Sequence, residues 1–172
     1  TLVEYPECRD KTSSGFQLMV IPLDVPGIKK GPSGRKLGLR YCSTAEIEFK
    51  AVKAEPQFMI GGPESGLELF KECMDKTVPL IGAVCVGVAR AAYQHALEVS
   101  KERKMAGHPV FEESAVRHSL VSMASKLNAA RLSVHHACWM IDKGMDHTLT
   151  SPQAKIVASQ AAQDIASRSM EI

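Results

Sequence analysis

Apolar residues recur every three or four positions from Gly66 to Lys104, a spacing that keeps them on one side of an α-helix. The stripe comprises Leu67, Phe70, Met74, Val78, Ile81, Cys85, Val88, Ala92, Ala96 and Val99. Pro79 lies inside it and is expected to kink the helix, because proline removes one backbone donor and clashes with the preceding turn. A helix of this length would extend for roughly 60 Å. The pattern therefore predicts a helical bundle rather than a small isolated domain.

Two more helices are predicted downstream. The second extends from Glu113 to Asp142, with apolar residues that step alternately by four and three: Val116, Leu120, Met123, Leu127, Ala130, Val134, Ala137 and Ile141. The connection at residues 107–109 is short enough to make the first two helices antiparallel. The third helix is expected to begin at Ser151-Pro152, a capping residue followed by a first-turn proline, and its apolar positions are Ile156, Val157, Ala161 and Ile165.

The first sixty residues lack helical periodicity and contain short apolar or alternating runs instead. Strands are predicted at Phe16–Ile21, Lys36–Cys42 and Ala45–Val52, with a fourth at Thr1–Tyr5. Residues 29–35 are expected to form a loop, because glycine and proline occupy three of these positions. In the last strand Ile47 and Phe49 alternate with charged residues, the pattern of a half-buried strand.

The predicted fold class is α+β: a partial β-sheet or barrel segment followed by three long antiparallel helices of a four-helix bundle. Residues 1–55 form the β part, residues 56–66 a linker rich in glycine and proline, and residues 67–172 the helical domain. The strands lack partners for their edges, and the last helix shows no stop signal. Both ends of the chain are therefore expected to continue in a longer protein.

Composition narrows the classes of partner. The chain has 172 residues, 45% of them hydrophobic, and 21 basic against 19 acidic side chains, so no strong overall charge attracts nucleic acid. No apolar run reaches the ~20 residues that a membrane span needs, so no membrane-spanning segment is expected. Five scattered cysteines without a CxxC pair fit a reducing compartment.

Candidate chemistry is sparse at this level. His135 and His136 are adjacent on a helix and point about 100° apart, and neither HxxxH nor ExxH occurs, so no metal site is expected. No catalytic nucleophile is expected either, because no strand-to-helix elbow is present. The basic cluster 101–104 either complements the helix dipole or binds phosphate. The residues Asp75, Lys76 and Thr77 are either a solvated turn or part of a site.

Three runs in the chain resemble stretches typical of acyl-CoA dehydrogenases. KLGLRYCSTAEIEF (residues 36–49) is similar to KLGIRASDTxELxF, ALEVSKERKMAGHPV (96–110) to ALxYAxERKQFGKPI, and KLNAARLSVHHACWMID (126–142) to ELEAARLLVYRAAW. Their order and spacings agree, and together with PGIKKG before the first run and AKIVAS in the last helix they cover nearly the whole chain. The sequence is therefore identified as resembling this family.

The resemblance implies the second half of the family's middle β domain and the first three helices of its C-terminal bundle. It also implies FAD as cofactor, an acyl-CoA substrate, an electron-transfer flavoprotein as acceptor, and a homotetramer or a complementing chain. The expected reaction is α,β-dehydrogenation of the thioester, in which a carboxylate removes the α-proton and hydride passes to flavin. The expected location is the mitochondrial matrix, with the bacterial cytoplasm as alternative.

The resemblance also assigns roles to individual residues. The DKTR motif that contacts the thioester corresponds to Asp75, Lys76, Thr77 and Val78, so its arginine is replaced. The ERKxF motif that reaches the FAD of a neighbouring subunit places Arg103, Lys104 and Met105 on that cofactor, with alanine in place of the aromatic residue. The EHQ motif on the same FAD corresponds to Glu112, Glu113 and Ser114, so its amide is replaced.

No residue of this chain is assigned as the catalytic base. In most members the glutamate follows a GGxGY segment beyond the third helix, and this segment does not occur before Ile172. In other members the base is on the first bundle helix, where Thr77 stands, and threonine is no base at neutral pH. The leading hypothesis is thus an acyl-CoA dehydrogenase homologue present as a fragment that is inactive alone. The alternative is a non-catalytic structural or assembly subunit of the same ancestry.

Overall fold

The computed structural model describes residues 2–4, 16–62 and 65–172. The chain divides into two compact units, Thr1–Lys71 and Glu72–Ile172, and each is described by itself. The first contains short strands and the second contains helices, so the predicted α+β class is confirmed. The domain limits at residues 55 and 66 stay predictions.

The first unit contains a three-stranded antiparallel sheet in the order β1-β2-β5. Its strands are β1 (Leu2–Glu4), β2 (Phe16–Met19) and β5 (Met59–Ile60), and the 3₁₀ turn Pro56–Phe58 precedes the last of them. Gln17 is 1% exposed, and its Nε2 donates to the carbonyl oxygen of Ile60 at 3.1 Å. This bond ties the linker residues back to the sheet, because it joins β2 and β5 across 43 positions.

A separate antiparallel ladder pairs β3 (Ile28–Ser33) with β4 (Ala45–Phe49). Two predictions are wrong here: most of the expected loop at 29–35 is a strand, and the expected strand Lys36–Cys42 is the loop that joins β3 to β4. Glycine and proline are tolerated in β3 because the ladder has only two strands and its register shifts between Lys30 and Ser33. Ile47 and Phe49 are 42% and 41% exposed, so the half-buried pattern predicted for β4 is not found in this chain.

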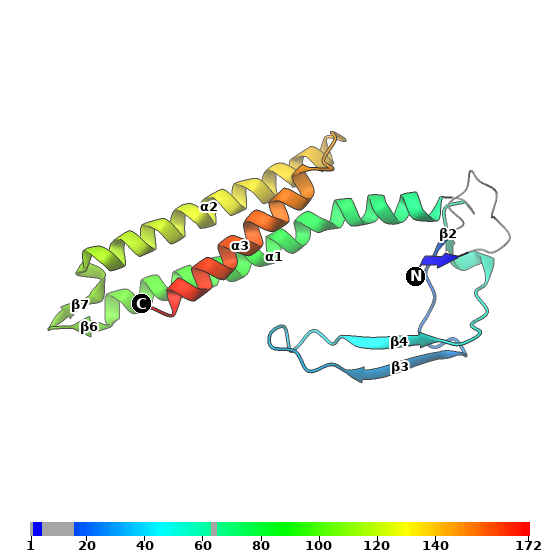
Figure 1. Cartoon of the computed structure of the whole chain (residues 1–172), viewed down its shortest axis with the longest axis horizontal. Helices are drawn as coiled ribbons and strands as arrows, with labels where there is room; N and C mark the ends of the chain where they lie inside the picture. Colours follow the sequence, from blue (N-terminus) through cyan, green and yellow to red (C-terminus); the bar gives the residue numbers. More distant parts are fainter. Residues whose placement is uncertain (1, 5–15, 63–64) are drawn as a thin grey trace. The chain divides into compact units, whose positions relative to one another are not determined.

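The helices are α1 (Gly66–Glu102), α2 (Ser114–Asp142) and α3 (Thr150–Ser169). Between α1 and α2 lie a two-stranded hairpin, β6 (Lys104–Met105) and β7 (His108–Pro109), and the 3₁₀ turn Val110–Glu112. In Figure 1 α2 and α3 lie alongside α1, and the β6–β7 hairpin connects α1 to α2. The most extensive helix contact is between α2 and α3. Three long helices are thus confirmed.

The core of the second unit lies between the three helices. Six of the eight apolar positions predicted for the second helix are buried: Leu120, Met123, Leu127, Ala130, Val134 and Ala137. They pack with Ala89 and Ala96 of α1 and with Ala154, Ala158 and Ile165 of α3. The side chains of Met123 and Ile165 are the largest in this core that have no exposed surface. Alternation by three and four thus identified the buried face of α2 correctly.

In α1 the buried face agrees only in part with the predicted stripe. Ala96 of the stripe is buried, and Cys85 and Ala92 pack against the core, whereas Ile81 and Val88 are 49% and 52% exposed. The buried positions of this helix are Gly66, Pro79, Gly82, Ala89, Ala96 and Ser100. The stripe missed most of them because it followed apolar side chains at helical spacing and passed over glycine, proline and serine. Small residues face the core here: a Cβ on Gly82 would lie 2.9 Å from Cγ2 of Val134. The helix continues through Pro79 without a break.

The third helix also differs from its prediction. It begins at Thr150, its N-cap residue is Leu149, and no side chain caps it. Ser151 lies inside the first turn with its side chain buried, so the expected capping role is wrong. Of the four predicted apolar positions, Ala161 and Ile165 are buried, whereas Ile156 and Val157 are 52% and 39% exposed. Ala154, Ala158 and Ala162 complete most of the buried face.

Length and composition alone make α1 a helix that could cross a membrane. No other helix among the described residues passes this test. A single such helix is a weak indication, because core helices of proteins without membrane contact pass it as well. The prediction that no segment spans a membrane stays a prediction.

Candidate functional site

The end of α1 and the start of α2 are held together by a tight hairpin. Ala106 and Gly107 have positive φ angles of 52° and 94°, which turn the chain between β6 and β7. The backbone N–H of Val110 donates to the carbonyl oxygen of Arg103 at 2.9 Å. The structure therefore brings two separate sequence runs, 103–105 and 113–114, to one end of the helical unit.

Arg103 is anchored by its backbone and by its guanidinium. Its N–H donates to the carbonyl oxygen of Val99 at 2.8 Å and continues the hydrogen-bond pattern of α1. Its Nη1 donates to the carbonyl oxygen of Ile172 at 2.6 Å. One of five guanidinium N–H donors is used in this bond. The remaining donors leave this residue able to bind an anion in a fixed orientation.

The α2 N-terminus next to Arg103 has free hydrogen-bonding capacity. Glu113 is the N-cap residue, and no side chain accepts from the first-turn N–H groups. Ser114, the first residue of α2, is exposed. His108 lies 4.0 Å from a carboxylate oxygen of Glu112 and 3.8 Å from one of Glu113, and these pairs are charged only when the imidazole is protonated. Unpaired N–H groups at a helix start favour anions.

The second set of predicted residues, 75–78, lies near the other end of α1. Lys76 Nζ contacts Glu72 Oε1 at 2.6 Å, and this hydrogen bond holds the pKa of Glu72 below its usual range. The hydroxyl of Thr77 donates to the carbonyl oxygen of Met74 at 3.1 Å. Asp75 and Val78 are half-buried. The hydroxyl of Thr77 is thus bonded to the backbone of its own helix.

The two sets cannot contact one small ligand. Asp75 and Arg103 are separated by 28 positions of continuous helix and turn, which corresponds to about 40 Å. The structure thus keeps the predicted substrate residues and the predicted cofactor residues apart on one chain. Residues 75–78 lie together on one part of α1, and residues 103–105 and 113–114 lie together at the junction of α1 and α2.

Sequence reasoning missed a groove between α1 and α2. Two adjoining pockets of about 380 and 390 Å³ share Tyr93, Ala124 and Asn128. Arg90 and Arg131 line one pocket, and the lining of the other includes Leu97, Phe111, Leu120, Val121 and Arg117. No periodicity signals this groove, because it combines exposed and half-buried positions of two helices. Across the described part of the chain, no group of three or more His, Cys, Asp or Glu side chains is arranged to hold a metal ion.

Comparison with known proteins identifies the class to which this arrangement belongs. The sequence model of the family described as "Acyl-CoA dehydrogenase, C-terminal domain" matches residues 64–172. That match covers more than half of the chain and includes all three helices. The chain belongs to the acyl-CoA dehydrogenase family, as its sequence resemblance indicated.

Individual relatives extend the similarity into the β part. Cyclohexane-1-carbonyl-CoA dehydrogenase of Geobacter metallireducens is 30% identical over 159 residues, which are 92% of this chain and 42% of the relative. The structure of butyryl-CoA dehydrogenase from Megasphaera elsdenii superposes with a TM-score of 0.87 at 26% identity, over 91% of this chain and 41% of that one. A chain solved in work on the electron-transferring flavoprotein of Acidaminococcus fermentans gives 0.88 at 25% identity, with the same coverages. This chain spans less than half the length of these relatives.

Proposed function

We propose that this chain is part of an FAD-dependent acyl-CoA dehydrogenase and supplies helical contacts to the cofactor and to the thioester substrate. One observation carries the proposal: the runs 103–105 and 113–114 lie at the two ends of one hairpin connection, beside the uncapped start of α2. Family membership and the names of the relatives as acyl-CoA dehydrogenases support it.

The residues at this junction fit an anionic cofactor such as FAD. Arg103 has free donors in a fixed orientation, and Lys104 is an exposed cation next to it. The uncapped N-terminus of α2 offers backbone N–H groups to a pyrophosphate. Glu112 and Glu113 oppose an anion at this place, and their carboxylates lie near His108. Met105 and Ser114 would complete the contacts in the positions of the family motifs.

When bound, FAD supplies the acceptor for the hydride of the acyl chain. The residues of this chain then position the two reactants. Arg103, Lys104, Met105, Glu113 and Ser114 would hold the FAD of a neighbouring subunit, because about 40 Å of helix separates them from the substrate residues. Asp75, Lys76, Thr77 and Val78 would line the thioester. Lys76 pairs with Glu72, and its remaining ammonium donors would be free to bind the substrate.

A second function is favoured by the chemistry of position 77. Thr77 carries a hydroxyl that is bonded to its own helix, and Val78 offers no charge. A chain with this helix and no base elsewhere would be a non-catalytic subunit that contributes its bundle to an assembly. The replaced arginine, aromatic residue and amide of the family motifs are consistent with weaker ligand binding, since each lost contact costs about 1 kcal/mol.

The partners and location follow the same inference. We infer a homo-oligomer and an electron-transfer flavoprotein as acceptor, because one structural neighbour comes from work on such a flavoprotein. The relatives from Geobacter and Megasphaera are bacterial, so we place the protein in a bacterial cytoplasm. The mitochondrial matrix, which was the first expectation from sequence, gains no support from these relatives.

The test is to purify the full protein that carries this chain and record its visible absorption spectrum. An enzyme of this class should show a flavin band near 450 nm (about one FAD per chain), which should bleach when acyl-CoA is added without oxygen. Arg103→Gln should lower the bound flavin at least fivefold. Lys101→Gln, a matched loss of positive charge two residues away on α1, should leave it unchanged.

Each result separates the two functions. A colourless protein that gains no colour when supplied with free FAD would contradict the enzyme and favour the non-catalytic subunit. A yellow protein that is not bleached by acyl-CoAs of short, long or branched chain would contradict the proposed substrate. If both Arg103→Gln and Lys101→Gln retained full flavin, the proposed cofactor contacts would be wrong.

A further inference from the structure

The β3–β4 ladder ends in a loop that holds large apolar side chains in solvent. We use the name β3–β4 loop for residues 34–44, which join the two strands. Leu37 is 95% exposed and Leu39 is 71% exposed, and the side chain of Tyr41 is fully exposed. In Figure 1 the loop extends beyond the ends of both strands. Apolar side chains that gather in this way mark an interaction surface rather than ordinary exposure of single residues.

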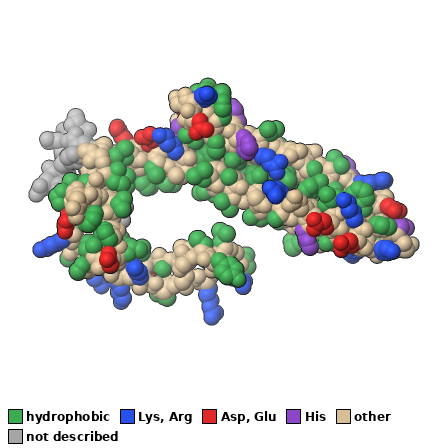
Figure 2. Space-filling view, turned by 180° about the vertical axis from the view of Figure 1, so that it is seen from behind, with side chains coloured by type: hydrophobic (Ala, Val, Ile, Leu, Met, Phe, Trp, Pro, Cys, Tyr) green, Lys and Arg blue, Asp and Glu red, His purple; other side chains and the backbone are tan. Residues whose placement is uncertain are grey.

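The same segment is strongly basic. Residues 28–45 contain no acidic residue and five cationic ones, namely Lys29, Lys30, Arg35, Lys36 and Arg40. All of them except the half-buried Lys36 are exposed. Within the part of the chain that the structure describes, no ion pair joins any of the five to a carboxylate. Figure 2 shows hydrophobic side chains together with Lys and Arg side chains along this part of the molecule.

The acidic residues of the ladder are separated from its apolar face. Successive side chains of a strand point to opposite faces of a sheet. Ile47 and Phe49 therefore share one face of β4, and its two glutamates share the other. The register places Lys30 opposite Ile47 on the apolar face, and Lys29 opposite Glu48 on the acidic face. One face of the ladder thus combines apolar side chains with a cation, as the loop does.

Hydrogen bonds hold the loop in one shape. The N–H of Gly34 donates to the carbonyl oxygen of Thr44 at 2.8 Å and closes the base of the loop. The ammonium of Lys36 donates to Thr44 Oγ1 at 3.0 Å and to the carbonyl oxygen of Cys42. The N–H of Cys42 donates to the carbonyl oxygen of Leu39 at 3.0 Å and forms a turn. A loop that is already ordered loses little conformational entropy when it binds.

We propose that the β3–β4 loop binds the surface of an anionic lipid bilayer. Leu37, Leu39 and Tyr41 insert into the interfacial layer of the bilayer, where apolar area leaves water and tyrosine is favoured. Arg35 and Arg40 contact the lipid phosphates around them. None of these residues belongs to the proposed cofactor or thioester contacts, so the proposal does not depend on dehydrogenase activity.

Two other partners explain only part of this surface. A nucleic acid would neutralise the cations through its phosphates, but it would leave the two leucines of the loop in water. A covering segment of a longer polypeptide would bury the leucines, but it would have to supply carboxylates for the unpaired cations. An anionic bilayer satisfies both kinds of side chain, because its surface is charged and the layer beneath is apolar.

Flotation of the full protein with lipid vesicles tests the proposal. The parent should bind vesicles of phosphatidylcholine and phosphatidylglycerol about tenfold more tightly than vesicles of phosphatidylcholine alone, and added salt should reduce this difference. Arg40→Gln should lower the partition coefficient on anionic vesicles about fivefold. Leu39→Ser should lower it by a similar factor, because the apolar area that the leucine buries in the bilayer is lost.

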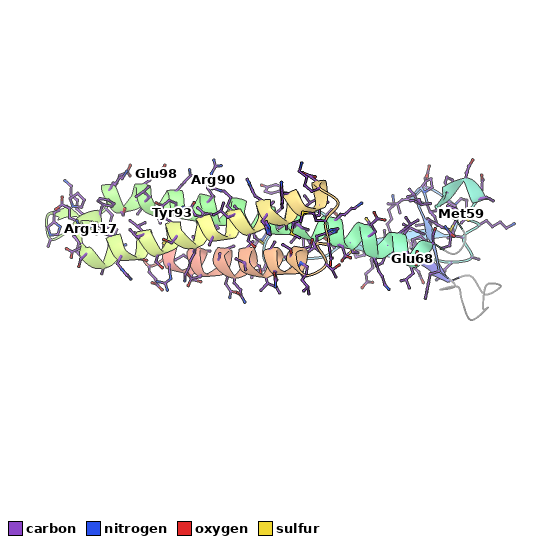
Figure 3. The ribbon with its side chains drawn as sticks, turned by 90° about the horizontal axis from the view of Figure 1, so that it is seen from above. Met59, Glu68, Arg90, Tyr93, Glu98 and Arg117 are labelled. Atoms are coloured by element: carbon purple, nitrogen blue, oxygen red, sulfur yellow. The ribbon has the colours of Figure 1, made fainter. Side chains whose placement is uncertain are left out.

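Matched substitutions on α2 provide the controls. Leu132→Ser removes a leucine that is 69% exposed, which matches Leu39. Arg117→Gln removes an exposed cation, which Figure 3 labels on α2. Both control variants should bind vesicles as the parent does. In Tyr41→Trp the new indole should shift its emission to the blue and be quenched by brominated lipid chains, a change that the parent lacks. Circular dichroism checks that all variants are folded.

The proposal would be overturned if the parent floated with neither kind of vesicle, the result expected when another segment of the polypeptide covers the loop. It would equally be overturned if Leu39→Ser bound as tightly as the parent and the emission of Tyr41→Trp did not change, because charge alone would then explain binding. Tighter binding of the parent to duplex DNA than to anionic vesicles, retained in Leu39→Ser, would assign the loop to nucleic acid instead.

Discussion

The buried faces of α1 and α2 are built from different side chains. The core face of α2 carries large apolar residues, among them Leu120, Met123 and Leu127, which are at most 5% exposed. On α1 the core positions are small, with Gly82 and Ala89 buried while Val84 is 57% exposed. Large apolar side chains therefore fill the core from α2, whereas the fully buried positions of α1 are mainly small.

The difference follows from how two helices share one interface. A large side chain on one helix needs a recess on the other, and the small residues of α1 provide recesses for side chains of α2 such as Val134. The large residues on the outer face of α1 are then available for other contacts. In this unit the residues buried on α1 depend on the size of the α2 side chains that face them, and not on their own hydrophobicity alone.

The largest change in the free energy of unfolding is expected at Met123, which has no exposed surface. Met123→Ala should lower the free energy of unfolding by about 2–5 kcal/mol, through lost burial and the cavity that remains. Leu132→Ala on the outer side of α2, where the side chain is 69% exposed, should change it by less than about 0.5 kcal/mol. Urea unfolding of both variants measures this. Equal losses would contradict the assignment of the core face.

Gly82 tests the recess on α1 directly. Its new Cβ in Gly82→Ala would lie 2.9 Å from Cγ2 of Val134 and 3.4 Å from the carbonyl oxygen of Ala154. Overpacking costs about 1–3 kcal/mol and the gain in helix propensity offsets about 1 kcal/mol, so a net loss of about 1 kcal/mol is expected. In a Val134→Ala background the same change should be neutral or stabilising. Thermal unfolding of the parent, the two single variants and the double variant gives the double-mutant cycle that measures this coupling.

Gly87 is the matched position on the open side of α1. A Cβ there meets nothing within 4 Å, so Gly87→Ala should raise the free energy of unfolding by about 0.5–1 kcal/mol. The same substitution thus acts with opposite sign five residues from Gly82. A loss of stability at Gly87 would show that another part of the folded protein covers this face.

The smallest change in the free energy of unfolding is expected at Asp164 of α3, which forms a salt bridge with Lys126 of α2. Its carboxylate accepts from Lys126 at 2.7 Å and from Arg168 at 3.0 Å, and these bonds hold its pKa below the ordinary value of 3.8. Asp164→Asn should lose about 0.5 kcal/mol, because the group is partly exposed and solvent screens it.

The stabilisation that the Asp164 carboxylate contributes should depend on pH in a defined direction. A lowered pKa stabilises the fold above the unfolded value of 3.8, and the contribution disappears as pH falls through the lower folded value. Unfolding curves of parent and Asp164→Asn should therefore differ at pH 6 and converge below 3.8. A difference that grows in acid would contradict the role of this carboxylate.

Sequence patterns predicted the long elements well and the short ones poorly. The length of α1 and the core face of α2 follow from periodicity, since many residues contribute to one signal. The exchange of strand and loop around residues 28–42 was missed, because glycine and proline in β3 are permitted only by an exposed two-stranded ladder. Part of the buried face of α1 was missed, since the need for a small residue at Gly82 depends on Val134, which is 52 positions away in the sequence.

The candidate sites were predictable only through resemblance to a family. Nothing in the composition around Arg103 distinguishes a cofactor contact from a charge that complements the helix dipole. The structure adds the hairpin that brings residues 113–114 to it and the bond to Ile172. Sequence alone did not reveal the α1–α2 groove, because its lining comes from two helices that meet only after folding.

The bond from Arg103 to Ile172 also has a consequence for the order of folding. It joins residues 69 positions apart, whereas the hairpin and the α2 helix form from neighbours in sequence. Closing so long a loop costs entropy that only completed packing of α3 repays. The guanidinium should therefore reach its final orientation late, after the helices have docked. Arg103→Ala is expected to accelerate unfolding while leaving the folding rate nearly unchanged.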